Sequence, residues 1–160
     1  MYLLLLTVHS TIRWLLLITL KTTLWVTFWG WKRKGDFNQR HFTYLNFLTA
    51  LAIIQLLLGV IIYCLSPMTE AFWSGLPQTI KIRPLRFFAI EHSTSMAGAI
   101  ILLIAAALLA RKASSDLLKF KVTGLCCALS MIIIITSIPW EFSPFVSRPH
   151  FRHLEILDYK

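Results

Sequence analysis

The chain has 160 residues, of which 57% are hydrophobic and only 14% are charged, and its formal net charge is +9. A soluble domain of this length cannot bury so large a share of apolar residues, so lipid must cover the excess. The basic residues gather at the ends of the apolar segments, as expected at a membrane boundary. Their position explains the positive charge, and no nucleic-acid partner is expected.

Four apolar segments follow one another along the chain, and each is long enough to cross a hydrocarbon core of about 30 Å as a helix. Their Leu, Ile and Ala runs lack the alternation of barrel strands, and helices are the other structure that satisfies the backbone in lipid. We therefore predict an all-α integral membrane protein, in which residues 1–141 form an up-down-up-down four-helix bundle and residues 142–160 an outer polar tail. The predicted helices lie at about residues 3–31, 42–65, 85–110 and 122–138.

The first apolar segment is predicted to be a membrane helix and not a cleaved signal peptide. It has no basic stretch before it, His9 and Arg13 interrupt it, and Trp29, Trp31 and Lys32 follow at its end. Aromatic and basic residues in this arrangement are typical of a membrane boundary.

Basic residues also predict how the bundle is oriented. The first and third connections are rich in them: Lys32, Arg33, Lys34 and Arg40 in the first, and Arg111, Lys112, Lys119 and Lys121 in the third. Positive charge favours the cytoplasmic side, so we expect a multi-pass protein of the bacterial inner membrane with both termini on the periplasmic side. The Pro-containing second connection is predicted to be irregular, with a short interfacial helix around Thr69 to Ser74.

Ionisable residues inside a membrane are costly, so each is a functional hypothesis. His9 enters the first helix about six residues from its outer end, and His92 enters the third at a matching depth, on the order of 9 Å below the boundary. The first and third helices of such a bundle run in the same direction and face each other diagonally. Two imidazoles in this arrangement are what one b-type haem needs, so His9 and His92 are the predicted axial ligands of the iron.

Residues near the histidine pair are consistent with a buried macrocycle. Small residues would leave space beside the helices: Ser93, Ser95, Ala97 and Gly98 on the third helix, and Gly59 on the second. Arg86, at the mouth of the third helix, is predicted to lie near the haem propionates. Arg13 is predicted to rise toward Glu91 and to pair with it, because the pair relieves the cost of both charges. Glu91 then orients a histidine, accepts a proton near a quinone, or only clamps two helices together.

Other possible ligands are interpreted as structural residues. Met96 shares a helix face with His92, so the two cannot flank one haem. His41 is expected to be a boundary residue at the cytoplasmic side, and His150 and His153 to be exposed polar residues of the tail. The cysteines, Cys64, Cys126 and Cys127, have no spacing that indicates zinc, covalent haem or a disulfide framework.

Four strings of residues occur in order along the chain: His9-Ser-Thr-Ile-Arg-Trp14, Gln55-Leu-Leu-Leu-Gly-Val-Ile-Ile-Tyr63, Arg86-Phe-Phe-Ala-Ile-Glu-His92 with Met96, and Ser137-Ile-Pro-Trp140. Together they resemble a family of small four-helix membrane proteins of Bacteroidota, commonly labelled cytochrome b-like. The resemblance spans about residues 1–141 and implies an inner-membrane protein with b-type haem that transfers electrons. The chain departs from the family at Ser93 and Thr94, where Pro and an apolar residue are expected, and it carries an additional tail.

The principal functional hypothesis is a haem-b electron-transfer subunit of a larger, respiratory-type membrane complex. A single haem cannot carry electrons across the whole membrane, so partner subunits are expected. Two alternatives remain open: a cofactor-free accessory or scaffold subunit, and a quinone-binding subunit whose pocket contains Gln55, Tyr63, Glu91 and His92. No nucleophile-base arrangement or Gly-rich phosphate loop is present in the sequence, so we do not expect an enzyme that acts on its own.

Overall fold

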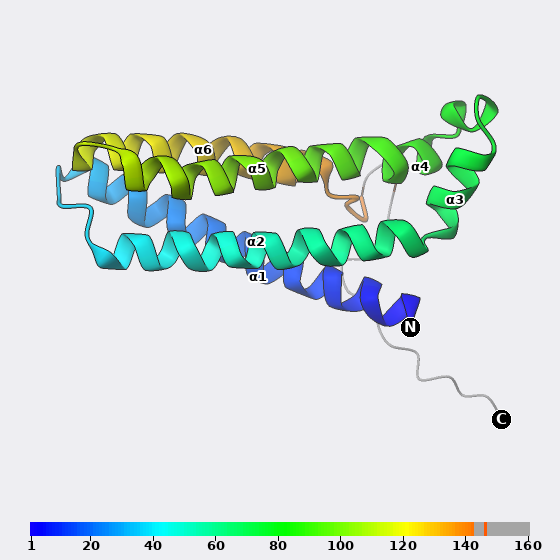
Figure 1. The fold of residues 1–160 in the computed structure, drawn as a ribbon, viewed down its shortest axis with the longest axis horizontal. Helices are drawn as coiled ribbons and strands as arrows, with labels where there is room; N and C mark the ends of the chain where they lie inside the picture. The colour runs from blue at the N-terminus through cyan, green and yellow to red at the C-terminus, as the bar shows by residue number, and fades with distance from the viewer. Residues whose placement is uncertain (143–145, 147–160) are drawn as a thin grey trace.

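The computed structural model describes residues 1–142 and residue 146, and every regular element in these residues is helical. The four longest helices are α1 (Tyr2–Lys32), α2 (Gln39–Leu65), α5 (His92–Lys112) and α6 (Asp116–Ser137). Consecutive long helices run in opposite directions and lie side by side along one axis (Figure 1). The predicted tail at 142–160 falls almost entirely outside the described residues, as do His150 and His153.

Four short elements lie between α2 and α5. The connection contains α3 (Pro67–Ser74) and the 3₁₀ helix η1 (Gln78–Lys81). It then runs through α4 (Arg83–Arg86) and the π-helical turn η2 (Phe87–Glu91) into α5 without a break. Helix α3 confirms the short helix predicted around Thr69 to Ser74, and Ser66 caps it by accepting a hydrogen bond from the Thr69 amide.

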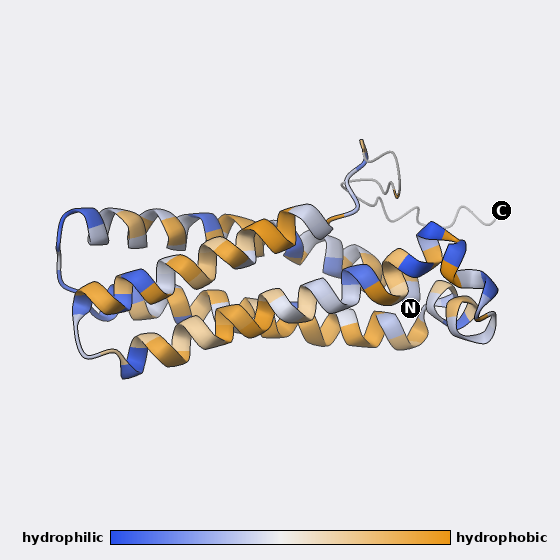
Figure 2. Ribbon diagram, turned by 90° about the horizontal axis from the view of Figure 1, so that it is seen from above, coloured by the Kyte–Doolittle hydropathy of each residue, from blue (hydrophilic) through white to orange (hydrophobic). Residues whose placement is uncertain are grey.

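The two ends of the bundle differ in composition. We call the end that carries the start of α1, helices α3 and α4, and the end of α6 the histidine end, because His9 and His92 lie there. The opposite end carries the α1–α2 and α5–α6 connections and is called the basic end. Figure 2 shows hydrophobic residues along the shafts of the helices and hydrophilic residues at both ends.

Each long helix packs against two others, in the cyclic order α1, α2, α5, α6. Helices α1 and α5 are therefore diagonal to one another across the bundle, as the chain order of four antiparallel helices requires when each connection is short.

The apolar residues divide between the interior and the outer surface. Fully buried residues come from all four helices: Leu20, Leu45, Leu103 and Ile134. Large aliphatic residues on the same helices remain more than half exposed: Ile18, Leu57, Ile101 and Ile132. Four helices are long and apolar enough to cross a membrane, namely Tyr2–Lys32, Gln39–Leu65, Arg83–Lys112 and Asp116–Ser137. The prediction of an all-helical chain with four apolar membrane helices is confirmed.

The start of α6 differs from the prediction, because the helix begins at Asp116 and not near Val122. The Ser115 hydroxyl accepts a hydrogen bond from the Leu118 amide and so caps the helix, and Asp116 in the first turn complements the helix dipole. The first turns of α6 contain polar residues and precede the apolar segment from which the helix was predicted. Hydropathy therefore located the apolar part of α6 and missed its capped start.

The basic end is held together by close aromatic packing. The Phe120 ring of α6 is buried against Phe37 and His41, with ring centroids 4.9 Å and 5.0 Å away. On α1, a Cβ atom added at Gly30 would lie only 2.4 Å from Cε1 of Phe120. Phe120 is only 2% exposed and packs against two other rings, so moving it away from a larger residue at position 30 would disturb this packing, and glycine is favoured at this helix crossing.

Substitution Gly30→Ala is expected to destabilise the bundle by about 1–3 kcal/mol, the usual cost of overpacking a well-filled interior. Gly124→Ala is the matched control, because a Cβ there would make an ordinary contact of 3.5 Å with Thr27. Alanine also favours helix over glycine, so the control should be neutral or slightly stabilising. Thermal unfolding of the two variants in detergent measures the difference, and equal melting temperatures would contradict the proposed crossing.

Candidate functional site

The candidate site lies at the histidine end, where the diagonal helices bring His9 and His92 together. His9 is on the third turn of α1, and His92 is the first residue of α5. Both side chains are partly buried, and a proton on one imidazole would be disfavoured by a positive charge on the other. Arg13 also interacts electrostatically with both rings. The interior of this end therefore contains two imidazoles and one guanidinium from two facing helices.

A backbone carbonyl orients the His92 ring. The Nδ1 atom of His92 lies 2.8 Å from the carbonyl oxygen of Ser137, the last residue of α6. The final carbonyls of a helix have no partner within it, so this oxygen is available as an acceptor. Because a carbonyl can only accept, Nδ1 carries the proton and Nε2 keeps its lone pair. This is the tautomer that metal-ligating histidines commonly adopt.

The backbone before His92 is a π-helical turn, an uncommon structure that occurs frequently at functional sites. The turn places two aromatic rings beside the imidazole: the Phe87 and Phe88 centroids lie 5.8 Å and 6.2 Å from that of His92. Tyr63 of α2 donates to the carbonyl of Ala89 at 3.2 Å and so ties the turn to the bundle. The sequence contains no simple signal for such a turn.

The His9 ring lies against α2. A Cβ atom at Gly59 would be 3.4 Å from Cε1 of His9, so the glycine makes room for the ring. Gln55 donates its Nε2 hydrogen to the backbone carbonyl of His9 over 2.9 Å. Among the described residues, neither the buried Nδ1 of His9 nor the buried Oε1 of Gln55 has a hydrogen-bond partner. Buried polar atoms without a partner are rare, and they are expected where a ligand or water binds.

The predicted pair between Arg13 and Glu91 is wrong. Glu91 pairs with Arg86, whose Nε donates to its Oε1 over 2.7 Å. The π-helical turn explains the difference, because it brings residues 86 and 91 together one π-turn apart. The Arg13 guanidinium instead lies 5.1 Å above the ring of Trp14, whose centroid is 6.2 Å from that of Trp140.

Arg86 has a structural role that the sequence did not predict. Its Nη1 donates to the carbonyl of Ile80 over 3.0 Å, so one guanidinium joins the 3₁₀ turn to Glu91. The residue predicted to lie near haem propionates is thus engaged with a carboxylate. The charge of Arg13 acts on both histidines.

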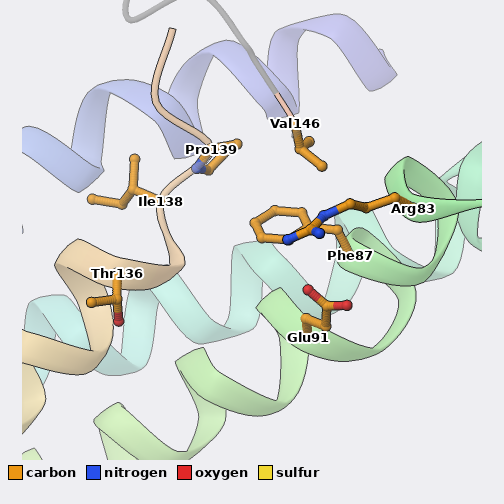
Figure 3. A pocket seen from close by; sticks show the side chains of 7 residues that line it. All are labelled: Arg83, Phe87, Glu91, Thr136, Ile138, Pro139 and Val146. Atoms are coloured by element: carbon orange, nitrogen blue, oxygen red, sulfur yellow. The ribbon is translucent and has the colours of Figure 1, made fainter. Parts of the chain in front are cut away.

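A cavity of about 160 Å³ lies where the end of α6 meets the start of the third membrane helix. Figure 3 shows the Arg83 and Glu91 side chains pointing into it. Its lining is Arg83, Phe87, Glu91, Thr136, Ile138, Pro139 and Val146. Of the four residues of the predicted quinone pocket, only Glu91 lines this cavity.

The other members of that predicted pocket have separate hydrogen bonds. The Tyr63 hydroxyl accepts from Nε1 of Trp73 at 2.8 Å besides donating to Ala89, whereas Gln55 reaches His9. The Tyr63 hydroxyl is thus occupied in joining α3 to the π-helical turn. The quinone pocket of these four residues therefore stays a prediction.

Comparison with known proteins adds no relative: no family model, curated protein or solved structure matches this chain. Its function must therefore be argued from the geometry of the site.

The observed pairing predicts which substitutions interact energetically. Arg86→Ala and Glu91→Ala should be coupled in a double-mutant cycle, whereas Arg13→Ala and Glu91→Ala should be additive. Both side chains of the observed pair are about a third exposed, at 34% and 38%, so screening limits the expected coupling to about 0.2–1 kcal/mol. Melting in detergent provides the free energies. Coupling between Arg13 and Glu91 that exceeds that of Arg86 and Glu91 would contradict the structure.

Proposed function

We propose that this protein is a haem-b-binding electron-transfer subunit of a larger membrane complex, with His9 and His92 as the axial ligands of one haem. The observation that carries the proposal is the histidine pair itself. Two partly buried imidazoles come from diagonal helices at the same end of the bundle, and the Ser137 carbonyl holds His92 in the tautomer with a free Nε2. When bound, a b-type haem supplies one-electron redox chemistry.

The donor set and its surroundings fit such a group. The buried Nδ1 of His9 has no hydrogen-bond partner among the described residues, which is expected where a ligand binds, and Gly59 lets the His9 ring lie close against α2. Phe87 and Phe88 cover the His92 ring and keep it out of water. Arg13, whose charge acts on both imidazoles, is the preferred cation for the propionates in place of Arg86.

The residues around the ligands would set how strongly they bind. A hydrogen bond from Nδ1 of a ligating histidine to a carbonyl orients the ring and makes Nε2 more basic. Ser137 therefore supports His92, and the bond from Gln55 to the His9 carbonyl fixes α1 against α2 at the other ligand. One centre near one end cannot move electrons across the membrane, so its exchange partner lies in a neighbouring subunit.

The purified protein is expected to show a reduced-minus-oxidised difference spectrum of b type. His9→Ala and His92→Ala should each abolish or greatly weaken the six-coordinate low-spin signal, because the iron loses an axial nitrogen. His41→Gln is the control: His41 lies at the basic end, and Gln at this position can preserve the capping box that His41 forms with Asn38.

A ligand exchange separates coordination from folding. His92→Met should retain haem with one thioether ligand and a raised reduction potential, as is typical of Met/His ligation. A purified wild-type protein that is helical but has no chromophore would contradict the haem proposal and favour the cofactor-free accessory subunit.

We further propose that the protein resides in the bacterial inner membrane with its histidine end toward the periplasm. The support is the concentration of Lys and Arg at the basic end, which the positive-inside rule places in the cytoplasm. An alkaline phosphatase fused after Lys160 should then be active, and a green fluorescent protein at the same site should be dark. The reverse result would show that the bundle is inverted.

A further inference from the structure

A groove on the surface of the basic end runs between α2 and α5, far from the histidine site. Its volume is about 380 Å³, and four residues of each helix line it at spacings of three and four along the chain. They are Asn46, Thr49, Ala50 and Ile53 on α2, and Ile104, Ala107, Leu108 and Arg111 on α5. Residues at these spacings occupy one face of a helix, so the groove follows both helices for about two turns.

The groove is apolar along its length and polar at its mouth. Ile53 and Leu108 are 40% and 55% exposed, which leaves aliphatic walls facing the lipid. Between them, Ala50 and Ala107 leave the space open because their side chains are short. Asn46 and Arg111 lie at the end nearest the α5–α6 connection. The pattern of an apolar channel with a polar head matches an amphiphile lying parallel to the helices.

The Arg111 guanidinium is held in place by two hydrogen bonds. Its Nη1 donates to the carbonyl of Ala107 over 2.6 Å, and its Nη2 donates to Oδ1 of Asn46. Within the described residues, no carboxylate lies within 4.0 Å of it. Because Oδ1 of Asn46 is the acceptor, the amide NH₂ of that residue is left to donate. A fixed guanidinium with further N–H groups, beside a primary amide, is suited to a phosphate group.

We propose that this groove binds an anionic phospholipid, with the phosphate headgroup at Arg111 and Asn46 and an acyl chain along Ile53, Ile104 and Leu108. The charge at the mouth favours a lipid over an apolar partner helix. Size favours it too: the groove extends over about 10 Å of helix, and its volume is small for a helix of about 10–12 Å diameter. The proposal does not depend on haem binding.

Native mass spectrometry of the full chain in detergent tests the site with phosphatidylglycerol and phosphatidylcholine of identical acyl chains. The wild type should bind the anionic lipid more tightly. Arg111→Gln should weaken phosphatidylglycerol binding about fivefold or more, because one cation near a lipid surface contributes about that factor. Phosphatidylcholine carries the same phosphate beside a cationic choline group, so its binding should weaken less. Lys112→Gln is the matched control: it removes the same charge from the neighbouring exposed residue, which does not line the groove, and should change binding less than twofold.

Three further measurements address the acyl chain, the headgroup and competing occupants. Ala50→Phe fills the groove from an exposed position and should weaken both lipids, while circular dichroism confirms that the helices remain. Inorganic phosphate alone should not displace the lipid. If Arg111→Gln and Lys112→Gln weakened phosphatidylglycerol binding equally, the effect would be one of general surface charge, and the proposed site would be wrong. Disulfide cross-linking of Ile53→Cys between two copies, with no lipid retained, would also overturn it and assign the groove to a chain–chain contact.

Discussion

The hydrogen bond from His92 to the carbonyl of Ser137 determines what the histidine end can do. It joins the first residue of α5 to the last residue of α6, and it leaves Nε2 of His92 as the atom with a free lone pair. A helix end inside a membrane protein needs partners for its carbonyls, and here a side chain that is suited to ligate a metal supplies one. The same contact thus satisfies a carbonyl at the end of α6 and fixes the orientation of the His92 ring.

Around that bond, the histidine end is built from side chains that reach the backbone of a neighbouring element. Gln55 reaches the His9 carbonyl, Tyr63 reaches Ala89, and Arg86 reaches Ile80. Such bonds position helices without filling the space between them, and polar atoms near His9 remain without partners in the described part of the chain. A cofactor proposed for this end would therefore meet a His92 ring that a hydrogen bond already orients.

The basic end differs, because aromatic side chains fill the space between its helices. Phe37, His41 and Phe120 fill the region that Gly30 leaves open on α1. A polar contact lies at the surface of this end, where Arg111 of α5 donates to Asn46 of α2 at the mouth of an apolar groove. The two ends thus differ: the histidine end contains two partly buried imidazoles, and the basic end carries a guanidinium that hydrogen bonds hold at the mouth of the groove.

The sequence by itself determined that the chain is helical, how many membrane helices it has, and approximately where they lie. A long apolar run can satisfy all its backbone hydrogen bonds in lipid by forming a helix, so hydropathy is sufficient to predict these features. It also singled out His9 and His92, because residue depth along a helix follows from counting residues. The partners of these groups depended on tertiary structure. The π-helical turn redirected Glu91 from Arg13 to Arg86, and the register of α6 against α5 brought the Ser137 carbonyl to His92. Both depend on a local change of helical pitch and on the exact point where a helix ends, neither of which apolar periodicity specifies.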